Sequence, residues 1–289
     1  LPISGSCSRI DHKQSALDPK GLVSQNQYDV FMLSVWITIF LFCTVGGCLF
    51  YVLWRYRAKN AEEAKEIPPQ SHGSSMVETG LIIASSIILV ILAVPTLQGI
   101  VLLNRVPDAN DSESLEKLGL DRSQIDGAIT VNVTGKRFFW VFEYPQFGIV
   151  TANELVFPAT KAVRINLRTE DVIHSFYIPA FRLKQDIIPG SVISYSITPT
   201  REGRYRLRDA HFSGAYFSDN QTHVIVQSKD DYSNWLQSTN EKPLVPGLSP
   251  GTVQYQKRLS KGNKGWATVP PAPPPMVNDP GNPDDPHEA

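Results

Sequence analysis

Two long runs of apolar residues stand out in the first third of the chain. Uncharged residues run from Val30 to Trp54, and a second uncharged run extends from Thr79 to Asn104. About 20 consecutive apolar residues are needed to cross the hydrocarbon core of a bilayer, and buried helices of soluble proteins, the alternative, rarely reach this length. We therefore predict a transmembrane helical hairpin over 29–104, with spans at 30–54 and 79–104.

The charges beside these runs predict how the hairpin is oriented. Arg55, Arg57 and Lys59 follow the first run closely, whereas after the second run Arg105 is the only basic residue before Lys117. An excess of Lys and Arg next to the helix ends marks the cytoplasmic loop. We expect the loop that connects the two spans in the cytoplasm. Both termini and the rest of the chain then lie on the outer, periplasmic side of a bacterial inner membrane.

From Ala128 onward the hydrophobic period becomes two. Apolar and polar residues alternate over 129–133, which is typical of a half-buried strand. Similar short strands, separated by Pro, Gly, Asn and Asp turns, are predicted at 138–144, 154–157, 162–168, 192–199, 203–207 and 222–227. Regularly spaced short strands predict an all-β Greek-key sandwich, here over 128–237, with a short closing helix at 230–236.

The remaining segments differ in composition from these two parts. Residues 1–28 form an outer N-terminal segment, and 105–127 form a polar linker between the hairpin and the β domain. The tail, 238–289, is rich in Pro and Gly and contains a proline run at 270–275. Such a tail favours extended, polyproline-like geometry and cannot form a core of its own. We expect it to lie on a partner subunit.

Charge and cysteine content exclude some classes of function. The chain has 27 Lys and Arg against 28 Asp and Glu, so no basic bias indicates a nucleic-acid partner. Three cysteines are too few for a disulfide scaffold. Cys43 and Cys48 lie in the first apolar run and are interpreted as packing residues. Cys7 ends a string similar to a bacterial lipobox, although Ser4 stands where that motif has an aliphatic residue, so lipidation of Cys7 is left open.

Two longer strings carry a family resemblance. Residues 135–145 read GKRFFWVFEYP, and residues 171–190 read DVIHSFYIPAFRLKQDIIPG. Following two apolar runs, these strings resemble subunit II of the haem-copper respiratory oxidases, over roughly 17–237. The resemblance implies a cupredoxin-like fold for the outer domain. It also implies a complex with subunit I, which carries the haems and CuB, and with subunit III.

In that family the outer domain holds a dinuclear copper centre. Its ligands are two bridging cysteines, two histidines, a methionine and a glutamate carbonyl, and the thiolates are the ligands that copper requires. His174 matches the first histidine. The other ligand positions are occupied by Asp209 and Ser213 in place of the cysteines, Phe217 for the second histidine, Asn220 for the methionine and His211 for the glutamate. We expect no copper centre and no cofactor in this subunit.

The resemblance implies roles for several further residues. Phe138 occupies the position of the family's tryptophan that accepts electrons from cytochrome c, and a phenyl ring is harder to oxidise than an indole. Glu78 matches the entrance of the K proton pathway, with an ordinary interfacial glutamate as the alternative. Arg182, Lys184 and Asp186 match a segment that faces subunit I near the haem propionates. Functional coupling and simple salt bridges are both open for these three.

Loss of the copper ligands together with the electron-accepting tryptophan predicts that electrons do not enter through this subunit. The cytochrome bo-type quinol oxidases share this loss. They also resemble this chain in the LDPKG string at 17–21 and in the aromatic-Ser-Gly string at 212–214. We therefore predict subunit II of a proton-translocating terminal oxidase that reduces O2 to water, with a quinol as donor and the β domain as a structural cap.

Two alternatives remain at this point. In the first, the chain belongs to an oxidase that receives electrons directly from a cytochrome c in a supercomplex, and the tail binds further subunits. In the second, the chain is a membrane-tethered protein that binds a metal ion through His174, Asp209 and His211, a mixed nitrogen and oxygen set suited to zinc or copper.

Overall fold

The structure, a computed structural model, describes residues 17–57, 73–104, 128–247, 249–262 and 269–280. The chain divides into two compact units, Gln27–Ile100 and the remainder, which are described separately. Cys7, the linker 105–127 and the basic residues beyond Arg57 in the loop between the apolar runs lie outside the described residues.

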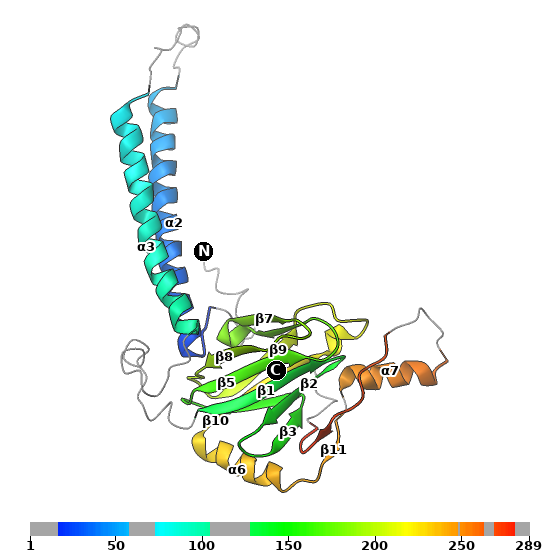
Figure 1. Cartoon of the computed structure of the whole chain (residues 1–289). Coiled ribbons are helices and arrows are strands. Elements are labelled where there is room, and N and C mark those ends of the chain that lie inside the picture. Colours follow the sequence, from blue (N-terminus) through cyan, green and yellow to red (C-terminus); the bar gives the residue numbers. More distant parts are fainter. Residues whose placement is uncertain (1–16, 58–72, 105–127, 248, 263–268, 281–289) are drawn as a thin grey trace, which may run out of the picture. The chain divides into compact units, whose positions relative to one another are not determined.

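The smaller unit consists of two long helices that run in opposite directions (Figure 1). Helix α2 is Leu22–Arg55 and helix α3 is Ser75–Asn104. Both are long and apolar enough to cross a membrane, and their large apolar side chains are exposed. Each helix begins before its predicted span because apolarity marks only the part in hydrocarbon, whereas the helix itself continues into the polar boundary.

The larger unit is a sandwich of two five-stranded sheets, in the orders β3-β2-β1-β5-β8 and β4-β10-β9-β6-β7. Neighbouring strands are antiparallel except for two parallel pairs, β1 with β5 and β10 with β4. The strands of the first sheet are β1 Ile129–Lys136, β2 Phe139–Tyr144, β3 Ile149–Ala152, β5 Val163–Thr169 and β8 Ile193–Ile197. Those of the second are β4 Glu154–Pro158, β6 His174–Ile178, β7 Leu183–Ile187, β9 Gly203–Asp209 and β10 Gln221–Gln227.

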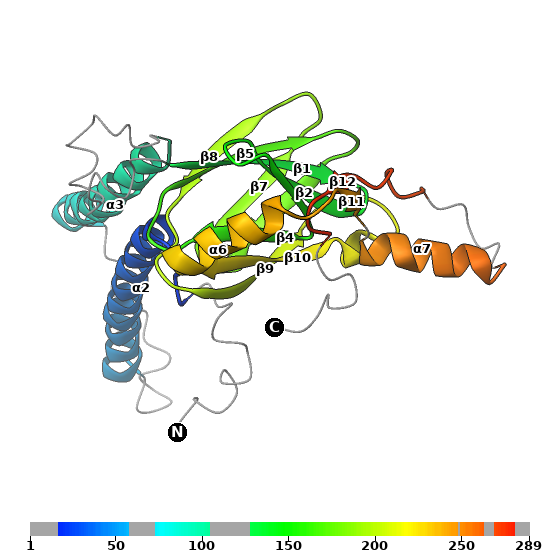
Figure 2. The ribbon, with the colours of Figure 1, turned by 90° about the horizontal axis from the view of Figure 1, so that it is seen from below.

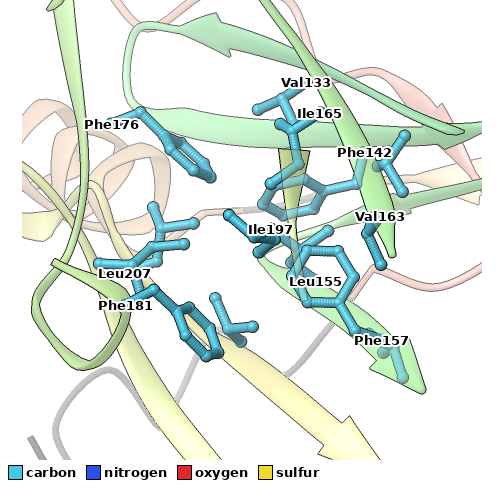
Figure 3. Close-up of a cluster of buried hydrophobic side chains, with 14 of the residues drawn as sticks. Val133, Phe142, Leu155, Phe157, Val163, Ile165, Phe176, Phe181, Ile197 and Leu207 are labelled. Atoms are coloured by element: carbon cyan, nitrogen blue, oxygen red, sulfur yellow. The ribbon is translucent and has the colours of Figure 1, made fainter. Parts of the chain in front are cut away.

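The core lies between the two sheets. Along β5, buried residues alternate with more exposed ones, which is the period that the sequence predicted. Figure 3 shows side chains of both sheets pointing toward one another, including Val133 and Phe142 from the first sheet and Leu155 and Leu207 from the second. The two-layer arrangement confirms the predicted cupredoxin-like sandwich.

Three strands of the sandwich were missing from the sequence prediction: β3, β6 and β7. They are only four or five residues long. Strands β6 and β7 form a hairpin around a short 3-10 helix, η3 Pro179–Phe181, so no continuous alternation crosses the 171–190 string. Phe138 was predicted as the first residue of a strand, but β2 begins one residue later.

The described part of the tail departs from the prediction. Instead of an extended segment on a partner, it contains β11 Val245–Pro246, helix α7 Pro250–Ser260 and β12 Met276–Val277. It folds against its own domain, where Asn278 N–H donates to the Val150 carbonyl at 2.8 Å. The prediction relied on composition and overlooked the Ser249-Pro250 pair, which is a helix-start signal. Ser249 Oγ accepts a hydrogen bond from the Thr252 N–H. Before the tail, helix α6 spans Lys229–Asn240 and is longer than predicted.

The segment before the first long helix is also joined to the sandwich. Lys20 N–H donates to the Ala180 carbonyl at 3.1 Å, and the Lys20 carbonyl accepts from Thr200 N–H at 2.8 Å. Gly21 forms an isolated bridge with Pro199. The chain is therefore fixed to the domain directly before it enters α2.

Candidate functional site

The carboxylate of Asp209, at the end of β9, gathers side chains from the predicted copper-ligand positions. Its Oδ2 lies 2.6 Å from His174 Nδ1 and accepts hydrogen bonds from Ser213 Oγ and Asn220 Nδ2, both at 3.1 Å. All four residues are buried. We call these four residues the Asp209 cluster.

The other oxygen of Asp209 is held by backbone. Oδ1 accepts from Ser175 N–H at 2.8 Å and from His211 N–H at 3.2 Å. The first bond links β9 to β6, which are neighbours in the sheet. A carboxylate that accepts several hydrogen bonds in a buried place is strongly constrained in position.

Two of the predicted positions do not join the cluster through their side chains. His211 is exposed, and its Nδ1 lies 3.2 Å from the Phe212 carbonyl oxygen. The ring of Phe217 packs edge-on against the exposed ring of Phe212, with centroids 5.1 Å apart. Of the predicted residues, the structure thus brings together His174, Asp209, Ser213 and Asn220.

A second carboxylate faces His174 from the opposite side. His174 Nε2 lies 2.9 Å from Asp171 Oδ1. Asp171 Oδ2 accepts from the Arg137 backbone N–H at 2.8 Å and from Arg137 Nε at 3.1 Å. Sequence reasoning did not single out Asp171, although it precedes His174 by three residues in the string that carries the resemblance.

The two carboxylates change the protonation of the imidazole. Burial alone would lower the pKa of His174, but hydrogen bonds to Asp171 and Asp209 outweigh it and raise that pKa to about 9. Burial likewise raises the pKa of Asp171, yet its hydrogen bond with His174 and bonds from backbone N–H groups bring it well below the usual value. At neutral pH the cluster therefore holds an imidazolium between two carboxylates, with the Arg137 guanidinium beside the outer one.

An aromatic wall closes the cluster. The rings of Trp140 and His174 meet edge to face with centroids 5.8 Å apart, and Trp140 Nε1 donates to the Asn220 carbonyl at 3.4 Å. Gly135 allows this approach, because a Cβ there would lie 3.1 Å from His174 Cδ2 and 3.2 Å from Trp140 Cζ3. The sequence contained this glycine within the aromatic string, but nothing marked its role.

The residues do not fit the family's dinuclear copper centre. Asp209 and Ser213 present hard oxygens where bridging thiolates are required, and both oxygens are engaged within the cluster. In the part of the chain that the structure describes, no group of three or more His, Cys, Asp or Glu side chains is placed to hold a metal ion. The hypothesis of a metal site formed by His174, Asp209 and His211 is therefore wrong.

Phe138 lies beside the cluster, but its side chain packs against other apolar residues. Its side chain is fully buried, and its ring meets that of Tyr216 edge-on, with centroids 5.6 Å apart. A Cβ built at Gly214 would lie 3.0 Å from two atoms of the Phe138 ring. Gly214 also has a φ of +135°, a conformation that favours glycine.

The other predicted site residues lie on other elements. Glu78 is exposed in the first turn of α3, in the smaller unit. Lys184 and Asp186 are exposed on β7, the edge strand of its sheet. Arg182, between η3 and β7, adopts a left-handed conformation with φ 50°.

Comparisons with known proteins agree with this architecture. The family described as "Cytochrome C oxidase subunit II, periplasmic domain" matches residues 148–228. The quinol oxidase subunit 2 of Bacillus spizizenii is 28% identical over 245 residues, which is 84% of this chain and 71% of that protein. The cytochrome c oxidase subunit 2 of Alkalihalophilus pseudofirmus is 30% identical over 251 residues, 86% of this chain and 69% of that protein.

Among solved structures, the periplasmic domain of cytochrome oxidase subunit II (CoxB) of Bradyrhizobium japonicum is 24% identical. The match covers 38% of this chain and 91% of the CoxB domain, with a TM-score of 0.37. The similarity to the A. pseudofirmus protein extends over most of both chains. This chain also has two apolar helices and a β-sandwich that the family model matches. The chain therefore belongs to the subunit II family of the haem-copper respiratory oxidases.

Proposed function

We propose that this chain is subunit II of a quinol-oxidising, proton-translocating terminal oxidase, and that its β domain is a structural cap without redox chemistry. The Asp209 cluster carries the proposal, since the residues at the copper-ligand positions bind one another. Relatives named quinol oxidase subunit 2, such as that of B. spizizenii, support a quinol as donor. Electrons then pass directly to the haems of subunit I, where O2 is reduced.

The cluster holds neighbouring segments of the domain together, as a bound metal ion would. Asp209 ties the end of β9 to β6 through the Ser175 N–H, and to the following loop through Ser213 and Asn220. A buried network of hydrogen bonds between several segments constrains the positions of the segments it joins. The domain thus keeps the shape of its redox relatives, and with it the surface that contacts subunit I.

That surface includes the exposed face of β7. Lys184 and Asp186 alternate with the buried Leu183 and Ile187, so both charges point to the same side of an edge strand. With Arg182 at the start of this strand, they form a charged strip suited to a partner with complementary polar groups. We assign this strip to subunit I. Subunit III and any further subunit bind surfaces that the folded tail leaves exposed.

We further propose that the first turn of α3, which contains Glu78, lies on the cytoplasmic side of the membrane. An acid at the boundary of a membrane helix collects protons, and the exposed carboxylate in the first helical turn is accessible to water. We propose that Glu78 is the entrance of a proton path into subunit I. Both termini and the β domain lie on the periplasmic side in this arrangement.

A pair of variants tests the role of Glu78. We expect Glu78→Gln to lower oxygen turnover by about tenfold or more in the purified complex, in line with the contribution of a positioned proton-transfer group. Glu78→Asp should retain most of the activity. Asp29→Asn, which removes an acid from the other helix, is the matched control and should leave turnover unchanged. Full activity of Glu78→Gln would leave only an interfacial role for this residue.

The electron donor is tested on the purified oxidase complex. Oxygen uptake is measured with a short-chain quinol and with reduced cytochrome c, together with copper and haem content. We expect turnover with the quinol alone and only the copper of subunit I. Cytochrome c turnover that resists quinol-site inhibitors would overturn the quinol assignment. Two additional coppers with near-infrared absorption would overturn the interpretation of the Asp209 cluster.

One observation favours a second candidate. The A. pseudofirmus relative, at 30% identity over 251 residues, is named cytochrome c oxidase subunit 2. In this alternative, a cytochrome c held in a supercomplex gives its electron directly to a haem of subunit I. The oxygen-uptake assay separates the two candidates when it is repeated on the supercomplex isolated in mild detergent.

A further inference from the structure

The tail helix α7 lies directly on the aromatic at the position of the electron-accepting tryptophan. A Cβ built at Gly251 would be 2.9 Å from Phe138 Cβ and 3.3 Å from Tyr216 Cβ. The helix backbone therefore touches both residues, and only glycine permits the contact. Phe138 is completely buried and Tyr216 is 8% exposed.

A second residue of α7 extends this contact. The ring of Tyr255 meets that of Tyr216 edge-on at a centroid distance of 6.1 Å, and Tyr216 in turn meets Phe138 at 5.6 Å. Edge-to-face aromatic pairs at such distances add to the stabilisation from apolar burial. The three rings form a continuous apolar contact between the tail and the domain.

The chain on either side of α7 is anchored to the domain. Before the helix, Gly247 N–H donates to the Pro275 carbonyl at 2.8 Å. After it, Ala272 N–H donates to the carbonyl of Arg137, the residue directly before Phe138. At its far end the tail continues along β3, an edge strand, where the Asp279 carbonyl accepts from Ala152 N–H at 2.8 Å. Figure 2 shows α7, β11 and β12 at one side of the sandwich.

We infer that α7 and residues 269–279 form a C-terminal cover over Phe138. A soluble redox protein would have to dock on this face to reach Phe138, and the cover already occupies it. Even weak redox encounters bury several hundred Å² around the electron-accepting residue. Here that area is occupied by the chain's own tail. The inference rests on the proposed function in one respect: it takes Phe138 to occupy the position of the electron-accepting tryptophan.

Hydroxyl-radical footprinting of the purified oxidase complex, with mass-spectrometric detection, tests the cover. In the wild type we expect Phe138 and Tyr216 to be protected, and the exposed Phe212 to be labelled. Gly251→Leu places a side chain where the contact has no room, so it should lift α7 and raise labelling of Phe138 and Tyr216 several-fold. Gln256→Leu adds the same side chain to the exposed face of α7 and should change nothing.

A second variant loosens the cover without added bulk. Ser249→Ala removes the N-cap of α7 and should raise labelling of Tyr216 and Tyr255 by a smaller factor. Tyr144 and Trp235, which pack together elsewhere in the domain, serve as an internal reference and should keep their wild-type labelling. If Gly251→Leu disturbs this reference, Ser249→Ala decides.

Three results would overturn the inference. The first is wild-type labelling of Phe138 and Tyr216 as strong as that of Phe212. The second is unchanged labelling of Tyr216 and Tyr255 in Ser249→Ala. The third is cross-linking of a photoreactive soluble c-type cytochrome to residues 136–145 of the wild-type complex. Footprinting does not depend on the donor, so failure of the quinol assignment in the oxygen-uptake assay leaves this test valid.

Discussion

The loop between β9 and β10, residues 210–220, is held on two sides by different kinds of contact. On its inner side, Ser213 and Asn220 donate hydrogen bonds to Asp209, which is paired with the His174 imidazolium. This side contains charged and polar groups that are buried from water.

The part of the same loop that faces the C-terminal cover makes aromatic contacts instead. Gly214 lies against the ring of Phe138, and Tyr216 packs between Phe138 and Tyr255 of the C-terminal cover. The loop thus replaces one metal centre by two layers, an ionic one inside and an aromatic one outside.

The difference lies in how each layer fails. Removing one member of a buried ionic network leaves its partners unpaired and desolvated, so the loss is large and abrupt. Apolar contacts are many and individually small, so truncations on the outer side produce graded losses. We therefore expect the inner layer to determine whether the domain folds, and the outer layer to determine how firmly the loop is closed.

Asp209→Ala is the change with the largest expected effect. It leaves the His174 imidazolium facing Asp171 alone and removes the acceptor of Ser213 and Asn220. Breaking a buried ion pair by removing one partner costs about 3–5 kcal/mol. Urea unfolding of the purified subunit in detergent, followed by tryptophan fluorescence, measures this cost, because Trp140 lies against His174.

Glu202→Ala is the matched control for Asp209→Ala. Glu202 is an exposed acid directly before β9 of the same domain, and its removal should change the free energy of unfolding by less than about 0.5 kcal/mol. A loss for Asp209→Ala no larger than that of the control would contradict a structural role for the cluster.

The charge state of His174 predicts a loss of stability at alkaline pH. Its folded pKa of about 9 lies above the ordinary value of 6.5, so the stabilisation is complete below pH 6.5 and is lost as pH rises through 9. The shift corresponds to about 3 kcal/mol. Urea midpoints measured between pH 6 and pH 9.5 should fall over this window. The low pKa of Asp171 acts in the opposite direction, with stability lost only in strong acid.

Two histidine variants isolate this effect. His174→Gln removes the titrating group and should flatten the pH dependence between 6.5 and 9. His211→Gln changes an exposed histidine on the same loop and should leave the dependence as in the wild type. An unchanged slope in His174→Gln would assign the alkaline loss to other groups.

The sequence predicted the fold for a physical reason, because strand alternation follows directly from burial of one face. The assignment of residues to copper-ligand positions rests on the family resemblance and stays a prediction. The sequence could not predict that Asp209, Ser213 and Asn220 bind one another, because a ligand alignment shows which residues replace a metal ligand but not where their hydrogen bonds go. Asp171 was missed for the same reason, because its contacts with His174 and Arg137 depend on the shape of the loop before β6.

The tail shows the opposite limit. Its composition of Pro and Gly correctly excluded an independent core, but composition carries no information on which surface the segment covers. The decisive residue is Gly251, whose role is to allow close contact with Phe138. A glycine in a Gly-rich segment gives no signal of that kind. Only the capping pair Ser249-Pro250 could have indicated a helix in advance.

On the outer layer, Ser249→Ala should cost about 1 kcal/mol, the usual effect of losing a helix N-cap. The Oγ of Ser249 accepts the Thr252 N–H at 3.2 Å, and both residues are buried. Urea unfolding gives the size of the loss. Ser228→Ala removes the equivalent cap of α6 and should cost a similar amount, but without raising the footprinting of Tyr216. Equal labelling of Tyr216 in the two variants would mean that the cap of α7 does not help to hold the outer layer in place.

The smallest expected effect is the coupling between the layers, measured by combining Asp209→Ala with Ser249→Ala. If both layers hold one cooperative loop, the second substitution costs less once the first has released the loop, with a coupling of about 0.5–1 kcal/mol. Asp209→Ala combined with Ser228→Ala should be additive, because α6 does not contact that loop through its cap. Additivity in both combinations would mean that the ionic and aromatic layers act independently, each on its own part of the loop.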